Sequence, residues 1–197
     1  MTAGRALFER HASTISCFFR NKVADEREDL IQRTFLACVE ARDRIRESSS
    51  FRAYLLRIAR NVLYDHFAAR ARDGDPLASS VIELGESPSK ILARQERDAL
   101  LLHALQHLPL ELQTCVELHY WEDLSIAELA DVFAVAPGTV KSRLFRAREL
   151  LRARLLELLA GHPERGRVLD GVDDVDAAFA SWAKGLAAAM HGRLDAE

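Results

Sequence analysis

Residues 124–151 contain two apolar helical patterns separated by a break of three residues, and no other feature constrains the fold as strongly. Ser125, with Glu128 three residues later, forms the pattern of a capping box, which predicts that a helix begins here. Pro137 follows the break and suits the first turn of a second helix. The residues expected on the buried face of the first helix are Ile126, Leu129, Ala130 and Phe133. The segment is therefore predicted to be a helix-turn-helix.

The second helix of this motif is basic, because residues 139–154 carry six Lys or Arg and one Asp or Glu. The residues predicted to pack inward are Val140, Leu144, Ala147 and Leu151. The residues left for the outer surface are Lys141, Ser142, Phe145, Arg146 and Arg148. In a helix-turn-helix, the start of the second helix meets base edges and the flanking cations hold phosphates. This face therefore predicts contact with the major groove of DNA, and the alternative is a charged surface helix after a short turn.

Individual side chains on this face have different expected partners. Lys141 and Ser142 are placed to read bases, and Phe145 could touch a thymine methyl group. Arg146 and Arg148 are better placed for the phosphate backbone. One further arginine, at position 143, lies between the two faces and could instead pair with an acidic neighbour such as Glu128 or Glu117.

The net charge of −3 does not by itself suggest a nucleic-acid partner, but the charges are segregated along the chain. Residues 1–72 carry 14 Lys or Arg against 9 Asp or Glu. Together with residues 139–154, they form two basic blocks separated by acidic stretches. Two contacts with a polyanion are one interpretation, and solvated helix faces are the other.

Helical spacing of apolar residues occurs nearly throughout and strand patterns are almost absent, so we expect an all-α protein with two small domains. We place one helical domain at 1–72, a flexible linker at 73–90, the helix-turn-helix domain at 91–160 and an extension at 161–197. The extension is predicted to hold an amphipathic helix that docks on the DNA-binding block or on a partner. Its apolar face would comprise Val172, Val175, Phe179, Trp182, Leu186 and Met190.

Cys17, Cys38 and Cys115 lack the paired spacing of a disulfide framework, which fits a reducing compartment. The first residues lack the apolar core of a signal peptide, and no apolar run is long enough to span a bilayer. We therefore expect a cytoplasmic protein without membrane insertion.

The amino-terminal block contains two more amphipathic helical patterns, at residues 28–36 and 51–61. Their expected core residues are Leu30, Phe35, Leu36, Phe51, Leu55 and Ile58. Three arginines and one amide lie off this core, at Arg52, Arg57, Arg60 and Asn61. The amide of Asn61 could receive an unstacked base while the arginines hold the phosphates of a single strand. A lone asparagine can equally be a helix cap or a surface residue.

The carboxyl-terminal motif resembles the fourth conserved region of bacterial RNA polymerase sigma factors of the extracytoplasmic-function type. The matching residues are Leu108-Pro109, residues 120–125, Glu128-Leu129-Ala130, residues 138–144 and Arg146-Ala147-Arg148. Helix-turn-helix modules of response regulators share this general layout. The amino-terminal block decides between them, because residues 28–36, residues 51–61 and Asp65 resemble the second conserved region of the same sigma-factor family. The resemblance covers about residues 5–155.

This resemblance implies a subunit that binds core RNA polymerase and recognises promoter DNA. Asp29 and Gln32 would face the clamp helices of the polymerase β′ subunit, and the fourth region would touch the β flap. The residues implied at the minus-ten element are Arg57, Arg60, Asn61 and Asp65. Those implied at the minus-thirty-five element are Thr139, Lys141, Ser142, Arg143, Phe145, Arg146 and Arg148. Residues 73–89 would thread the RNA exit path, and an anti-sigma protein is a candidate partner that no residue identifies.

Several positions depart from the family pattern, so the promoter preference of other family members cannot be assigned to this chain. Tyr54 stands where Trp is usual, and Ala68 stands where Arg is expected, which leaves Arg70 and Arg72 as the nearest phosphate candidates. The other departures are Gln113 for a frequent Arg, Asp123 for a frequent Gly and Ala136 for a frequent Ser.

Two rival interpretations remain open at this point. The first is a helix-turn-helix regulator that is not a polymerase subunit. The second is a metal site, because two pairs of residues, His103 with His107 and Cys115 with His119, are spaced four apart. Packing is the expected role of both pairs, since leucines interleave with the histidines. No phosphate loop or nucleophile–base constellation is evident, so we expect no enzyme activity, cofactor or metal.

Overall fold

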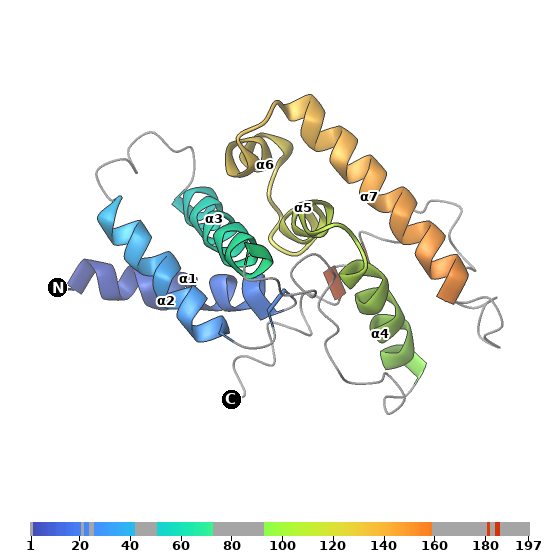
Figure 1. Ribbon diagram of the computed structural model, residues 1–197, viewed down its shortest axis with the longest axis horizontal. Coiled ribbons are helices and arrows are strands. Elements are labelled where there is room, and N and C mark those ends of the chain that lie inside the picture. The colour runs from blue at the N-terminus through green and yellow to red at the C-terminus, as the bar shows by residue number, and fades with distance from the viewer. Residues whose placement is uncertain are drawn as a thin grey trace. The chain divides into compact units, whose positions relative to one another are not determined.

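The computed structural model describes residues 2–20, 22–23, 26–41, 51–72, 93–158, 181 and 184–185. Across these ranges the regular structure is helical and no strand occurs, which confirms the all-α prediction (Figure 1). The predicted linker and the apolar face of the carboxyl-terminal extension lie outside the described residues. Of that extension, Ser181, Lys184 and Gly185 are helical. No described helix is both long enough and apolar enough to cross a membrane.

Seven helices account for nearly all of the described residues. Their bounds are α1 Thr2–Arg20, α2 Arg27–Glu40, α3 Phe51–Arg72, α4 Ala93–Gln106, α5 Leu110–Tyr120, α6 Ile126–Phe133 and α7 Pro137–Leu158. They fall into two compact units. The first unit contains α1, α2, α3, α6 and the first turn of α7, whereas the second contains α4, α5 and the rest of α7.

In the first unit, α1, α2 and α3 pack against one another around an apolar core. The helix α2 buries Leu30, Thr34 and Cys38, which are spaced four apart and therefore share one side of the helix. The hydroxyl of Thr34 donates to the carbonyl oxygen of Leu30 at 2.7 Å, so this buried polar group is satisfied. The apolar residues that complete this core include Ile15, Phe18, Phe19, Leu55, Leu56 and Leu63.

The structure corrects the prediction that Leu36 belongs to the core, because its side chain is 60% exposed. Successive α-helical residues are about 100° apart, so position 36 lies about 200° around the helix from buried Thr34. The predicted core residues Leu30 and Leu55 are buried. The other predicted members, Phe35, Phe51 and Ile58, are only partly buried.

In the second unit, α5 is buried on all sides from Leu112 to Leu118. Its polar side chains include Gln113, whose amide Nε2 donates to Oε1 of buried Glu117 at 2.9 Å.

All three cysteines are free and buried. Burial raises the pKa of the Cys115 thiol to about 12, so this thiol is neutral and unreactive near neutral pH.

The helix-turn-helix prediction is confirmed at both ends of α6. Oγ of Ser125 accepts from the backbone N–H of Glu128 at 3.2 Å, and Oε2 of Glu128 accepts from the backbone N–H of Ser125 at 2.9 Å, which completes the capping box. At the other end Ala134 adopts a left-handed conformation with φ 53°, and α7 begins three residues later at Pro137. The predicted inward residues of α7, Val140, Leu144, Ala147 and Leu151, are at most 3% exposed.

Candidate nucleic-acid interface

The predicted recognition side of α7 is open to solvent. Its exposed residues are Thr139, Lys141, Ser142, Phe145 and Arg146. They lie opposite the buried positions 140, 144 and 147, so the helix separates a packing face from a polar and cationic one. Phe145 is 62% exposed, which is unusual for a large apolar side chain surrounded by polar residues. The exposed face therefore combines two positive charges, two hydroxyl groups and one aromatic ring.

Two other predicted DNA contacts on α7 are turned toward α5 instead. Nη2 of Arg143 lies 2.6 Å from Oε1 of Glu111, and the arginine side chain is 19% exposed. The structure thus gives Arg143 an acidic partner, Glu111, that was not among the neighbours considered from the sequence. Nη1 of Arg148 donates to the hydroxyl of Tyr120 at 3.3 Å. Both arginines join α7 to α5, and a role for either at DNA stays a prediction.

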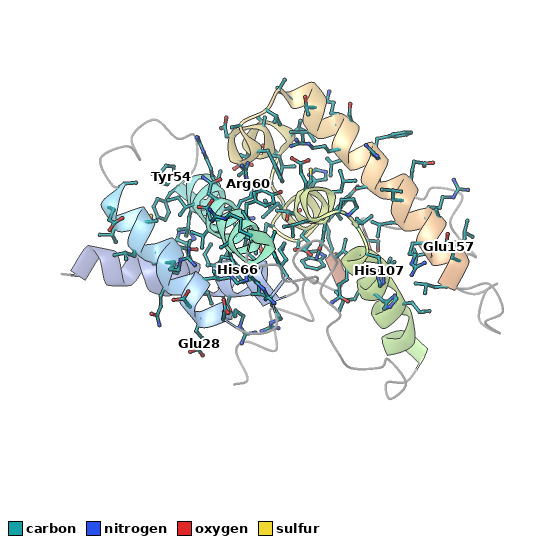
Figure 2. The ribbon with its side chains drawn as sticks, viewed as in Figure 1. Glu28, Tyr54, Arg60, His66, His107 and Glu157 are labelled. Atoms are coloured by element: carbon teal, nitrogen blue, oxygen red, sulfur yellow. The ribbon has the colours of Figure 1, made fainter. Side chains whose placement is uncertain are left out.

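On α3, three of the predicted minus-ten residues form an exposed stripe. Arg57, Asn61 and Asp65 are spaced four apart and all are exposed. Arg60 departs from this stripe because its Nη1 donates to the carbonyl oxygen of Val132 in α6 at 2.8 Å. Figure 2 shows Arg60 on the side of α3 that faces α6. The structure therefore brings three of the four residues together and separates the fourth.

Tyr54, which stands where the family usually has Trp, is partly buried near the start of α3. Its hydroxyl donates to the carbonyl oxygen of Ala41, just beyond the end of α2, at 3.4 Å. The aromatic ring thus carries a polar contact that links α3 to the end of α2.

The exposed side of α2 is partly polar and partly apolar. Asp29, Gln32, Leu36 and Val39 are all exposed and spaced by three, four and three residues, which places them on one side of the helix. Leu36 and Val39 are 60% and 61% exposed. A surface ion pair joins Asp29 to Arg33 at 3.7 Å and contributes little to stability. From the sequence we placed Leu36 in the core and did not consider Val39, although their spacing from Gln32 indicates one shared face.

His66 follows the exposed stripe of α3 but lies inside the first unit, 6% exposed. Its Nδ1 is 3.3 Å from Oε2 of Glu26. Burial lowers the pKa of His66, and the negative charge of Glu26 opposes that shift only in part. His66 is therefore a neutral packing residue at physiological pH, not a cation for phosphate.

The two histidines of α4 and its following turn contact each other. The ring centroids of His103 and His107 are 4.2 Å apart, and Nδ1 of His107 donates to the carbonyl oxygen of His103 at 2.7 Å. Burial lowers the pKa of His103, with the neighbouring His107 as the next cause. Among the described residues, no group of three or more His, Cys, Asp or Glu is arranged to hold a metal ion.

Asp123, which stands where the family frequently has Gly, adopts a positive φ of 50°. This is the left-handed region, where glycine has no steric cost and aspartate is better tolerated than most residues. Its Oδ1 lies 3.4 Å from Nζ of Lys184. The backbone conformation gives a physical reason for glycine at this position in related chains.

Comparison with known proteins identifies two conserved regions along the chain. The family description "Sigma-70 region 2" matches residues 7–73, and "Sigma-70, region 4" matches residues 92–151. The RNA polymerase sigma-H factor of Pseudomonas aeruginosa is 35% identical over 147 residues, which cover 69% of this chain and 76% of that protein. The ECF RNA polymerase sigma-E factor of Escherichia coli K12 is 28% identical over 142 residues, or 66% of this chain and 74% of that one.

Among solved structures, the fold is similar to that of the sigma factor RpoE from Bartonella quintana, solved in complex with the anti-sigma factor NepR. The TM-score is 0.64 at 24% identity, over 79% of this chain and 98% of that one. The region 2 match covers most of α1 and all of α2 and α3. The region 4 match covers α4, α5, α6 and α7 as far as residue 151. The chain therefore belongs to the sigma-70 family of RNA polymerase sigma factors, and to its extracytoplasmic-function type.

Proposed function

We propose that this chain is a sigma factor whose three exposed helix faces each perform one step of promoter recognition. It binds core RNA polymerase through α2, contacts the minus-ten element through α3 and reads the minus-thirty-five element through α7. The observation that carries the proposal is the exposed face of α7, where Lys141, Phe145 and Arg146 face solvent while its other side is packed. A helix built only for packing or solubility does not need an exposed aromatic ring among cations.

On α7, the expected division of labour follows from position along the helix. Lys141 and Ser142 lie in the first turns, which is the part of a recognition helix that reaches base edges. The ring of Phe145 offers an apolar contact for a thymine methyl group, and Arg146 offers a charge for a backbone phosphate. Arg143 would first have to leave Glu111, so we assign it a supporting role in orienting α7.

On α3, we assign the exposed stripe to single-stranded minus-ten DNA. The amide of Asn61 can donate to and accept from one base edge at the same time, which suits capture of an unstacked base. Arg57 supplies a cation one turn before Asn61, and the carboxylate of Asp65 can accept from a base amino group one turn after it. All three reach solvent without moving the core.

On α2, we extend the polymerase contact from Asp29 and Gln32 to Leu36 and Val39. Exposed apolar side chains beside polar ones are typical of a protein-binding surface, in which the apolar part is desolvated and the polar part forms the rim. The occupant we propose is the clamp-helix region of the polymerase β′ subunit, as the family resemblance implies. An anti-sigma protein stays a candidate partner without an assigned surface.

Three single variants test this proposal, and each is expected to impair a different step of transcription initiation. Leu36→Ser is expected to weaken binding to core polymerase, Asn61→Ala to impair opening of the promoter, and Lys141→Ala to weaken binding to duplex DNA upstream. Each is measured in a reconstituted system with core polymerase and a promoter library, and Ala127→Ser, at an exposed position of α6, serves as the control. A chain that binds duplex DNA but never core polymerase would be a helix-turn-helix regulator instead. Equal loss at every step by all three variants would make these residues structural.

A further inference from the structure

Two arginines flank the exposed face of α7, one along each edge. Successive residues of an α-helix are about 100° apart, so angles around α7 can be counted from Lys141. On this count the exposed face spans about 0–140° and the packed face about 240–300°. Arg143 lies at about 200° and Arg148 at about 340°, between the two faces on opposite sides. The residues that define the faces are Lys141, Ser142, Phe145 and Arg146 for the exposed one and Leu144, Ala147 and Leu151 for the packed one.

Both arginines reach the same neighbouring helix, α5, at its two ends (Figure 1). Nη2 of Arg143 lies 2.6 Å from Oε1 of Glu111, in the first turn of α5. Nη1 of Arg148 donates to the hydroxyl oxygen of Tyr120, the last residue of α5, at 3.3 Å. Glu111 and Tyr120 are about 14 Å apart along the helix axis. We call these two contacts, Arg143 with Glu111 and Arg148 with Tyr120, the α5 clamp.

The α5 clamp lies at the margin of the packed core of the second unit. The side chain of Arg143 is 19% exposed, and Tyr120 is buried. Burial is the main cause of the raised pKa of Cys115, and the charges of Arg143 and Glu111 act on that thiol as lesser, opposing causes. The ion pair is therefore close to the buried centre of α5, where water screens charges less than at an open surface.

Polar contacts fix the rotation of a helix more tightly than apolar ones do. The packed side chains of α7 hold it against the unit, but burial of apolar surface has no preferred direction. Hydrogen bonds and charge-assisted pairs depend on distance and angle. Because the two contacts of the α5 clamp lie on opposite edges of the packed face, rotation of α7 in either sense must stretch one of them.

We propose that the α5 clamp sets the rotation of α7 and thereby its choice of bases, which makes Glu111 and Tyr120 positioning residues for reading the minus-thirty-five element. The inference rests on the proposed function, because it takes Lys141 and Phe145 as residues that meet base edges. A rotation of about 20° moves the outer surface of a helix by about 2 Å, since its radius with side chains is about 5–6 Å. Hydrogen bonds to bases do not tolerate such a shift.

Contacts with phosphates tolerate the same rotation better. The attraction between a cation such as Arg146 and a phosphate falls only gradually with distance. Loss of the α5 clamp is therefore expected to reduce discrimination between DNA sequences more than the affinity for DNA in general. General destabilisation of the fold would instead weaken binding to every sequence alike.

The test uses the chain in complex with core polymerase and two promoter fragments, one of which has a scrambled minus-thirty-five element. Fluorescence anisotropy gives the two dissociation constants, and their quotient is the discrimination ratio. The dependence of the logarithm of the binding constant on the logarithm of salt concentration has a slope of about 0.9 per neutralised phosphate. Arg143→Gln and Glu111→Gln are each expected to lower the discrimination ratio about three- to tenfold. Neither should reduce the salt slope, because neither residue contacts a phosphate.

Further variants separate positioning from direct contact with DNA. Arg146→Gln removes the same charge from an exposed position of α7, so it should weaken binding to both fragments and lower the slope by about 0.9. Combining Arg143→Gln with Glu111→Gln should cost no more than either alone, since both remove one contact. Exchanging the two charges, Arg143→Glu with Glu111→Arg, should recover part of the ratio. Tyr120→Phe removes one hydroxyl group and should lower the ratio about threefold.

Thermal unfolding followed by circular dichroism checks that each variant is folded at the assay temperature. The positioning role is overturned if Arg143→Gln lowers the salt slope by about 0.9, because Arg143 would then contact a phosphate. It is also overturned if Glu111→Gln leaves the ratio unchanged, if it weakens binding to both fragments equally, or if the effects of the two single variants multiply in the double variant.

The same experiment separates this inference from the proposed function. A wild-type chain that forms no complex with core polymerase, or whose complex does not distinguish the two fragments, refutes the proposed function and this inference with it. A wild-type complex that distinguishes them as well as the clamp variants do refutes this inference alone.

Discussion

Replacing Ala134 with glycine is expected to stabilise the helix-turn-helix. Ala134 ends α6 with φ 53° and ψ 47°, and its N–H is bonded to the carbonyl oxygens of Ala130 and Asp131, which glycine would preserve. The left-handed conformation costs an L-residue about 1–2 kcal/mol that glycine avoids. Glycine in turn loses about 0.4–1 kcal/mol through the greater freedom of the unfolded chain. The steric relief exceeds the entropy loss, so Ala134→Gly should raise the free energy of unfolding by roughly 0.5–1 kcal/mol.

The assay is urea unfolding followed by circular dichroism, with hydrogen exchange of the α6 amides as a local measure. A gain of this size moves the midpoint upward by roughly 0.3–0.5 M urea. Ala127→Gly is the matched control, because Ala127 is exposed in α6 itself and is not among the described residues with positive φ. It should lower the free energy of unfolding by about 0.4–1 kcal/mol, since nothing offsets the entropy loss. If both variants lose stability equally, the strain assigned to Ala134 does not exist.

Four further predictions concern the capping box of α6, the recognition face of α7 and the turn before α6. Ser125→Ala should lower stability by about 1 kcal/mol, and Ser125→Asp should restore most of it; a urea midpoint unchanged by the alanine would contradict the capping role. Hydrogen bonds from Ser125 hold the pKa of Glu128 below its ordinary value, so this stabilisation is present above the unfolded-state pKa and is lost as pH falls through the folded-state pKa. Glu128→Gln should therefore flatten the acid side of the stability profile, and an unaltered profile would argue against it. Phe145→Ala should change stability by less than about 0.5 kcal/mol, since the ring is exposed, yet weaken binding to its selected promoter duplex about tenfold; equal binding would remove Phe145 from the interface. Asp123→Gly should be neutral or stabilising and Asp123→Val destabilising in thermal unfolding, because φ is 50° there, and the reverse order would be inconsistent with backbone strain.

Features set by neighbours within one or two helical turns could be predicted from the sequence. The capping box needs only Ser125 and Glu128, and the buried face of α7 follows from apolar residues three and four apart. The left-handed Ala134 gave no such signal, because the turn lacks the glycine that usually marks this conformation. The left-handed conformation of Asp123 could have been predicted, because related chains frequently have glycine at this position.

Features set by distant parts of the chain could not be predicted. Leu36 was placed in the core because it is apolar, but the neighbouring helices of the first unit cover the side of α2 that contains Leu30 and Cys38. The bond from Arg60 to Val132 joins residues 72 apart in the sequence, and Arg143 finds Glu111 on another helix. No local period encodes such pairings. The family resemblance assigned both arginines to DNA, and only for Arg143 did the sequence also suggest an acidic partner.

A promoter-recognition subunit of RNA polymerase must bind core enzyme, so this binding is the decisive measurement for the claim that the chain is such a subunit. Purified chain is titrated against fluorescently labelled core polymerase, and the resulting complex is assayed for transcription from a promoter library. We expect a stoichiometric complex that starts transcripts at a defined subset of promoters, with Leu36→Ser weakening the complex and Ala127→Ser leaving it intact. A folded chain that shows no binding to core polymerase, while still binding duplex DNA, would contradict the claim.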